Sequence, residues 1–181
     1  YCENCDLISY DGKSEPIIKN KYQQIFSPQT AYQITSMLKG VIERGTGKGL
    51  RELQLELAGK TGTTNKNTDT WFIGFTSNLV VGVYIGYDNP RSLGKFETGS
   101  KTAMPIFKEF IKETANTFNA RPFKVADNLK MMVIDAKTGE KANLKTKLAI
   151  IESFKQFDKK LNNIPANFDS GLNTTNILKF Y

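Results

Sequence analysis

The clearest pattern along the chain is an apolar stripe that begins after Ser27-Pro28. Apolar side chains recur every three or four residues while the far side stays polar, at Ala31, Ile34, Leu38, Val41 and Ile42. Serine is a favoured N-cap, proline fits the first helical turn, and Gly45 is suited to end a helix. The pattern therefore predicts a helix from about residue 27 to residue 45.

Three apolar segments of strand length follow the GTGKG linker, at about residues 55–64, 69–76 and 79–87. The last two are apolar at successive positions, so we expect a sheet covered on both faces. A three-residue hairpin loop would place Gly74 opposite Gly82, with Gly86 on the same face, and a helix packed there. We expect buried side chains at Trp71, Ile73, Phe75, Val81, Val83 and Ile85.

The remaining segments are predicted from weaker patterns. Residues 1–26 indicate a loop or hairpin, and residues 102–118 a helix with a stripe at Ala103, Ile106, Phe107, Phe110, Ile111 and Phe118. LKMMVID predicts a short strand, residues 144–161 a lysine-rich helix, and the Asn-rich tail from Asn162 poor order. The fold class expected is α+β, an antiparallel sheet flanked by helices.

Length and charge limit the classes of protein that remain open. The 181 residues, 39% of them hydrophobic, can bury a core, and we expect a piece of a longer protein because the chain begins without methionine. The net charge of +7 comes from lysines scattered singly among acidic residues, so we expect no nucleic-acid partner. A weak attraction to an anionic wall polymer or membrane face stays open.

The chain contains no histidine, which excludes Ser-His-Asp and Cys-His catalysis and histidine zinc motifs. Any nucleophile here would need lysine as its base. Cys2 and Cys5 form a CxxC that is compatible with half a zinc site, a redox pair or a disulfide. We expect a solvent-exposed structural pair, and neither a metal nor a cofactor.

The segment AGKTGTT, residues 58–64, carries the candidate chemistry. It is not a phosphate-binding loop, because Gln54 stands where that motif requires glycine. As a strand it places Thr61 and Thr63 on one face, and Gly62 between them has no side chain to block an extended ligand at the edge. Two hydroxyls and the Lys60 ammonium would then converge on a spot suited to a ligand carboxylate.

LAGKTGTT stands among three further segments, SPQTAYQITSMLKGVIERGTG before it and TWFIGFTSNLVVGVYIGYDNPRSLG and ETGSKTAMPIFKEFI after it. Together they resemble the C-terminal half of the transpeptidase domain of class A penicillin-binding proteins of the 1A type. The resemblance implies part of a β-lactamase/transpeptidase-like fold over residues 27–123. Residues 1–26 would return from an upstream region, and residues 124–181 would form a C-terminal extension.

These enzymes resemble β-lactamases in using an S-x-x-K, an S-x-N and a KTG element. The resemblance implies that Lys60 and Thr63 are catalytic: Lys60 holds the substrate and the S-x-N serine, and the Thr63 N–H is an oxyanion-hole donor. It implies substrate binding by Thr61, Gly62, Thr63 and Thr64. The ligand would be the terminal carboxylate of a D-Ala-D-Ala stem peptide or of a β-lactam.

The chain departs from the family pattern because no serine is followed at the second position by asparagine. Two S-x-x-K matches occur, at Ser36 and Ser92. Ser36 would point away from the apolar stripe to solvent, and the Ser92 match is broken by Gly94 in a loop. We expect neither to be a nucleophile, and we expect the catalytic serine to lie before Tyr1.

The function hypothesis is a fragment of a peptidoglycan D,D-transpeptidase that is inactive alone. The resemblance implies a membrane-anchored parent on the periplasmic face of the inner membrane. Two alternatives stay open: a non-catalytic carboxylate-binding or peptidoglycan-binding module, and a serine β-lactamase relative.

Overall fold

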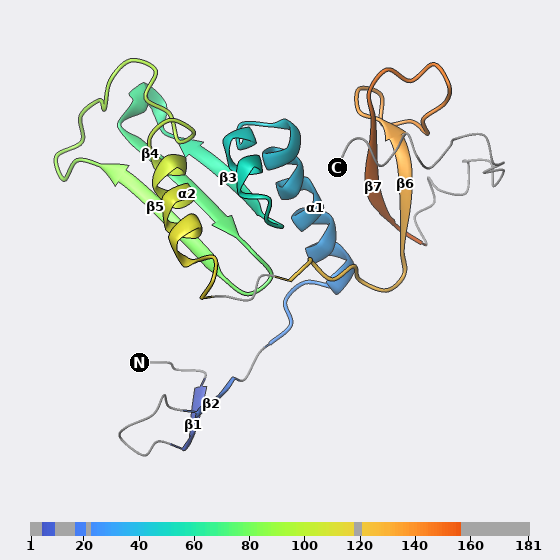
Figure 1. The fold of residues 1–181 in the computed structure, drawn as a ribbon, viewed down its shortest axis with the longest axis horizontal. Coiled ribbons are helices and arrows are strands. Elements are labelled where there is room, and N and C mark those ends of the chain that lie inside the picture. The colour runs from blue at the N-terminus through green and yellow to red at the C-terminus, as the bar shows by residue number, and fades with distance from the viewer. Residues whose placement is uncertain (1–4, 10–16, 21–22, 118–120, 157–181) are drawn as a thin grey trace.

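The computed structural model describes residues 5–9, 17–20, 23–117 and 121–156. Figure 1 shows a central sheet with one helix across a face and another beside an edge, and a β-hairpin at each end of the chain. The strands are β1 Cys5–Ser9, β2 Ile17–Asn20, β3 Ala58–Thr63, β4 Asp69–Phe75, β5 Val80–Gly86, β6 Leu129–Asp135 and β7 Ala149–Lys155. The helices are α1 Pro28–Arg44, α2 Ala103–Thr114 and the short 3₁₀ helices η1 Lys48–Leu53 and η2 Asn65–Asn67.

The predicted segment 1–26 contains an antiparallel hairpin of β1 and β2. This confirms the hairpin reading within the described residues. Cys2 lies outside them, so the pairing expected for Cys2 and Cys5 stays a prediction, as does poor order from residue 162 onward.

Helix α1 begins and ends where its sequence signals place it. The Ser27 hydroxyl accepts a hydrogen bond from the Thr30 N–H at 3.3 Å, and the Gly45 N–H donates to Val41 O at 3.0 Å. Its apolar stripe is only partly covered, because Ile42 is buried while Ile34 remains 46% exposed. The helix lies beside β3 rather than across the sheet (Figure 1).

The central sheet is antiparallel with the order β3-β4-β5, and α2 packs across one face. The core under α2 is centred on Phe72 and Phe107, whose ring centroids are 4.8 Å apart. Burying each such side chain stabilises the fold by about 1.5–3 kcal/mol. Gly74 permits this approach, because a Cβ there would lie 2.5 Å from Phe107 Cζ. The buried core comprises Ile42, Leu50, Leu57, Phe72, Ala103, Met104, Phe107 and Ile111.

The prediction of a sheet covered on both faces is wrong in the described structure. Trp71 and Ile73 are 42% and 48% exposed, and Phe72 occupies the buried face instead. The predicted partners Phe75, Val81, Val83 and Ile85 are half-buried. Because the apolar residues of β4 continue on both faces, the sequence alone does not say which face α2 covers.

The predicted glycine row is also wrong, because the hairpin loop is one residue shorter than expected. The Thr76 N–H donates to Leu79 O at 2.9 Å, which pairs Phe75 with Val80 and Gly74 with Val81. A shift of one residue exchanges the faces of a strand. Gly74 therefore faces α2, while Gly82 and Gly86 lie on the other face.

The predicted helix over residues 144–161 is wrong where the structure describes it. Residues 149–155 form β7, which pairs with β6 along its full length. The leucines of the ragged stripe do not reach a core, since Leu144 is 90% exposed and Leu148 51%. The β-branched pair Ile150-Ile151 favours a strand, and β6 supplies the hydrogen-bonding partner.

The β6–β7 hairpin docks on α1 through polar contacts. Glu152 Oε1 accepts a hydrogen bond from Arg44 at 2.7 Å, and the Gln33 side-chain amide donates to Ser153 O at 2.9 Å. The Lys155 ammonium donates to the Thr30 hydroxyl at 2.8 Å. These contacts bind the C-terminal hairpin along the length of α1.

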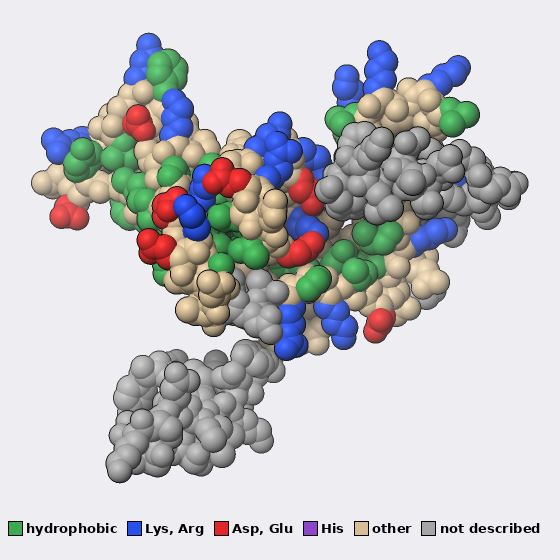
Figure 2. All heavy atoms as spheres, in the orientation of Figure 1, with side chains coloured by type: hydrophobic (Ala, Val, Ile, Leu, Met, Phe, Trp, Pro, Cys, Tyr) green, Lys and Arg blue, Asp and Glu red, His purple; other side chains and the backbone are tan. Residues whose placement is uncertain are grey.

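Charges are mixed on the face shown in Figure 2, where basic side chains lie beside acidic ones over the centre of the molecule. The described residues include ion pairs such as Lys39 with Glu56 at 3.0 Å and Lys108 with Glu52 at 2.7 Å. Within the ranges given above, no helix has the length and hydropathy needed to cross a membrane.

Candidate functional site

The candidate site is the outer edge of β3. This strand pairs with β4 on one side, and no strand within the described part of the chain pairs with its other side. The Thr64 N–H donates to Asp69 O at 3.0 Å, and hydrogen-bonded pairs alternate along an antiparallel ladder. The N–H and C=O groups of Thr61 and Thr63 therefore point away from β4, toward the outer edge.

Lys60 and Thr61 come together at this edge as the sequence predicted. The exposed Lys60 ammonium donates to Thr61 O at 2.8 Å and lies 3.4 Å from the Thr61 hydroxyl. The Thr61 hydroxyl is also 3.0 Å from the hydroxyl of Thr46, which follows α1. Position 46 was missed by sequence reasoning because GTGKG has the composition of a linker.

The Thr63 hydroxyl does not join this group, contrary to the expected convergence of two hydroxyls. It accepts a hydrogen bond from the Gly99 N–H at 3.1 Å, on the loop that leads into α2. Gly99 packs directly on β3, since a Cβ there would lie 2.6 Å from Gly62 O. The loop thus supports the strand from the α2 face, and the Thr63 backbone rather than its hydroxyl faces the edge.

Thr64 lies in a separate cluster at the turn between β3 and β4. The Asp69 carboxylate accepts hydrogen bonds from Tyr84 at 2.8 Å, Thr68 at 2.9 Å and Thr64 at 3.2 Å. The hydrogen bond from Tyr84, followed by that from Thr68, lowers the pKa of Asp69 below its usual value of 3.8. The same contact raises the pKa of Tyr84. These bonds fasten the turn that sets the position of β3.

Neither S-x-x-K serine is arranged as a nucleophile. Ser36 is half-buried rather than solvent-facing, because its hydroxyl donates to Glu152 Oε2 at 3.4 Å, and Lys39 pairs with Glu56 instead. The Ser92 hydroxyl accepts from the Gly94 N–H at 3.2 Å within its own loop. A serine nucleophile needs a base within hydrogen-bonding reach. The base of an S-x-x-K site is its lysine, but Lys39 pairs with Glu56 and Lys95 lies over the Phe96 ring. The carboxylate that Ser36 contacts, Glu152, is itself ion-paired with Arg44.

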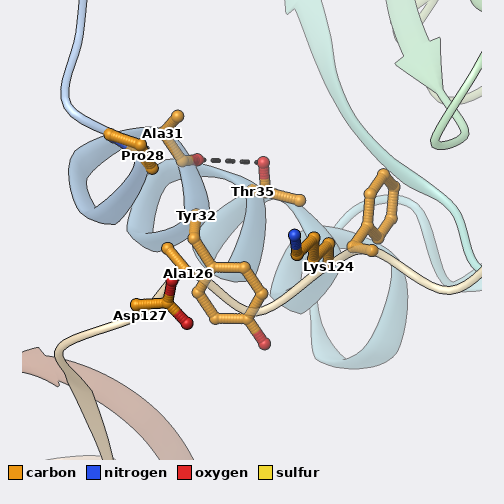
Figure 3. A pocket seen from close by; sticks show the side chains of 8 residues that line it. Pro28, Ala31, Tyr32, Thr35, Lys124, Ala126 and Asp127 are labelled. Carbon is orange, nitrogen blue, oxygen red and sulfur yellow. Dashed lines mark hydrogen bonds between the residues drawn. The ribbon is translucent and has the colours of Figure 1, made fainter.

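A hollow of about 390 Å³ lies between α1 and residues 123–127. Figure 3 shows Tyr32 of α1 beside Lys124 and Asp127, with the Thr35 hydroxyl bonded to its own helix at Ala31 O. The hollow contains none of the residues predicted from AGKTGTT. The outer edge of β3 is the better candidate because an ammonium, a hydroxyl and outward backbone groups meet there.

The fold is a mixed helix-and-sheet domain with an ammonium, a hydroxyl and outward backbone groups at one strand edge. Residues 12–112 match the model of the penicillin-binding protein transpeptidase domain, and the match covers more than half of the chain. The chain therefore belongs to the penicillin-binding protein transpeptidase domain family. This confirms the resemblance and the fold class that the sequence indicated.

Relatives named penicillin-binding protein 1A agree with the family. The chain is 42% identical to one from Rickettsia typhi over 156 residues, 85% of this chain and 20% of that protein. It is 38% identical to one from Pseudomonas aeruginosa over 137 residues, 75% of this chain and 17% of that protein. The crystal structure of penicillin-binding protein 1A from Haemophilus influenzae superposes with a TM-score of 0.64 at 30% identity, over 72% of this chain and 21% of that one. The chain thus spans about a fifth of the length of these relatives.

Proposed function

We propose that this chain supplies the substrate-carboxylate and oxyanion strand of a serine-type D,D-transpeptidase that cross-links the stem peptides of peptidoglycan. The nucleophilic serine and the S-x-N serine come from the upstream part of the same protein. The observation that carries the proposal is the β3 edge, where Lys60 and Thr61 meet beside outward-directed backbone groups. Membership in the transpeptidase family supplies the reaction class.

Each residue of the edge has a distinct role in this proposal. The Lys60 ammonium holds the substrate and the S-x-N serine, and the Thr61 hydroxyl binds the terminal carboxylate, while Thr63 contributes through its backbone because its hydroxyl is bonded to Gly99. The Thr63 N–H is one of two oxyanion donors, a contact worth about 3–4 kcal/mol of barrier where such donors have been removed. Gly62 keeps the edge unobstructed for an extended peptide, and Thr64 continues the edge at the turn.

The partners are peptidoglycan stem peptides and β-lactams, whose carboxylates and amide carbonyls suit the same donors. The parent protein is anchored in the inner membrane with this domain on the periplasmic face. Protease added to spheroplasts should digest the domain without lysis. Protection until the membrane is opened would contradict this placement.

The test of the proposal is penicillin acylation by the full-length protein. Lys60→Ala removes the ammonium that makes a charge-assisted hydrogen bond to the ligand in this proposal. The second-order rate of penicillin acylation should therefore fall by orders of magnitude. Lys60→Arg restores the charge but not the compact ammonium, so it should remain impaired. Thermal melts should show that both variants are folded.

Lys48→Ala is the matched control, because it removes one exposed positive charge from η1 close to the end of α1. It should leave the acylation rate near that of the wild type. If Lys60→Ala acylates within about threefold of the wild type, well under 1 kcal/mol of barrier, Lys60 is not part of the site. A full-length wild type that binds penicillin without acylation would favour the non-catalytic binding module.

A further inference from the structure

The turn that follows α1 is built to present one side chain, that of Thr46. The N–H groups of Gly45 and Gly47 both donate to Val41 O, at 3.0 and 2.9 Å. A Cβ on Gly45 would lie 2.8 Å from Val41 O, and one on Gly47 would lie 3.1 Å from Ile42 Cγ1. The chain therefore folds back on α1 so closely that glycine is favoured on both sides, while Thr46 between them is exposed.

The contact of Thr46 has a chemical consequence for Thr61. A threonine hydroxyl has two acceptor lone pairs and a single proton to donate. The Lys60 ammonium, 3.4 Å away, can only donate to the Thr61 hydroxyl, and the Thr46 hydroxyl lies 3.0 Å away on the same oxygen. When Thr46 also donates, both acceptor positions of Thr61 are occupied, and its proton is left to point at a ligand.

We propose that Thr46 is a positioning residue for carboxylate recognition, which orients the Thr61 hydroxyl as a donor to the terminal carboxylate of the substrate. The inference rests on the proposed function, because it assigns the ligand group that Thr61 serves. The inference predicts that the Thr46 hydroxyl makes the site prefer a ligand with a carboxylate over an otherwise identical ligand without that charge. A purely structural role would change stability without changing this preference.

The position of α1 supports the assignment, because it holds the turn against β3. The Lys39 ammonium is 3.0 Å from Glu56 Oε1 in the segment that leads into β3. Gly47 itself is buried beneath the turn. Thr46 is thus anchored from two sides, which lowers the entropic cost of holding its hydroxyl in one orientation.

The experiment measures acylation of the full-length protein by a penicillin and by the methyl ester of the same penicillin. Thr46→Val keeps the shape of the side chain and removes the hydroxyl, so the rate with the free acid should fall about tenfold, the scale of one hydrogen bond. The rate with the ester should stay within about twofold, and Thr46→Ser should restore the acid rate to within about threefold. In a Thr61→Val background, Thr46→Val should have little further effect, since the two hydroxyls act as one unit.

Thr35→Val is the control, because the Thr35 hydroxyl bonds to Ala31 O within α1. It should leave the preference for acid over ester unchanged. The inference is overturned if Thr46→Val acylates at the wild-type rate, if it slows acid and ester equally, or if its effect is additive with Thr61→Val. Should Thr46→Val lose its melting transition, Thr46→Ala gives the same comparison. Because wild-type acylation tests the proposed function separately, a failure of this inference can be distinguished from a failure of the proposed function.

Discussion

The backbone of Gly99, in the loop before α2, packs against the backbone of Gly62 in β3. A Cβ there would lie 2.6 Å from Gly62 O and 3.2 Å from Gly62 N, and would also meet Trp71 O. These neighbours are main-chain atoms of two paired strands, so no rotamer change can relieve the overlap. Because Gly99 has no side chain, the loop can pack directly against β3 at Gly62.

Gly99→Ala should therefore destabilise the protein by about 1–3 kcal/mol, the usual cost of overpacking a tight contact. It should also slow penicillin acylation, because the displaced atoms belong to the KTG strand. Thermal or urea unfolding of the full-length protein measures the first effect.

Gly82→Ala is the matched control for this substitution. The nearest atom to a Cβ at Gly82 is Ile73 Cγ1 at 3.9 Å, an ordinary contact on the exposed face. Its stability should lie within about 0.5 kcal/mol of the wild type. Equal losses from the two glycines would show that the Gly99 contact does not restrain β3.

Among the elements, the β3–β4 hairpin depends on the carboxylate cluster at its turn. Asp69 accepts hydrogen bonds from Thr64 and Thr68 beside the turn and from Tyr84 on β5. It therefore connects all three strands at the end nearest Thr63. These bonds favour the ionised carboxylate, which is why the pKa of Asp69 is lowered.

The cluster should make the hairpin sensitive to acid. Because the folded-state pKa of Asp69 lies below the unfolded value of 3.8, its contribution is fully present above that value and is lost as the pH falls through the lowered pKa. The stability difference between wild type and Asp69→Asn should be constant near pH 6 and should shrink as the pH falls from 3.8 through the lowered pKa. A difference that stays constant over this interval would show that the carboxylate does not stabilise the turn.

Most elements could be predicted from the sequence where the apolar pattern and a cap agree. Ser27, Pro28 and Gly45 located α1, and the outer-edge position of the KTG strand followed from its small residues. Long-range partners could not be predicted in this way. Residues 149–155 form a strand because β6 supplies a pairing partner from elsewhere in the chain. The positions of the glycines across the β4–β5 hairpin depend on a loop that is one residue shorter than predicted. Thr46 contacts Thr61 only because α1 lies beside β3.

On the scale of the whole molecule, the face of the sheet opposite α2 is apolar and uncovered within the described residues. Trp71, Ile73, Val80 and Tyr84 are 42%, 48%, 71% and 49% exposed. Their side chains lie on neighbouring strands of that one face. Exposed apolar patches of this kind mark surfaces that bind another part of a protein or a partner.

The 181-residue chain alone should therefore bind a hydrophobic dye such as anilinonaphthalene sulfonate at this face. Replacing Trp71 and Tyr84 by serine should reduce the dye fluorescence.

The 181-residue chain should form no penicillin adduct that survives denaturation, because neither S-x-x-K serine is hydrogen-bonded to the lysine of its own motif. A labelled band that disappears in Ser36→Ala would overturn the rejection of Ser36.

The contacts between α1 and the C-terminal hairpin also bear on the order of folding. Strands β3, β4 and β5 form a meander of close sequence neighbours, whereas the hydrogen bonds from Gln33 to Ser153 and from Ser36 to Glu152 span 120 and 116 residues. Closing a long loop costs more chain entropy than closing a short one, and distant pairings slow folding. We therefore expect the meander that carries Lys60 to form before the β6–β7 hairpin docks on α1.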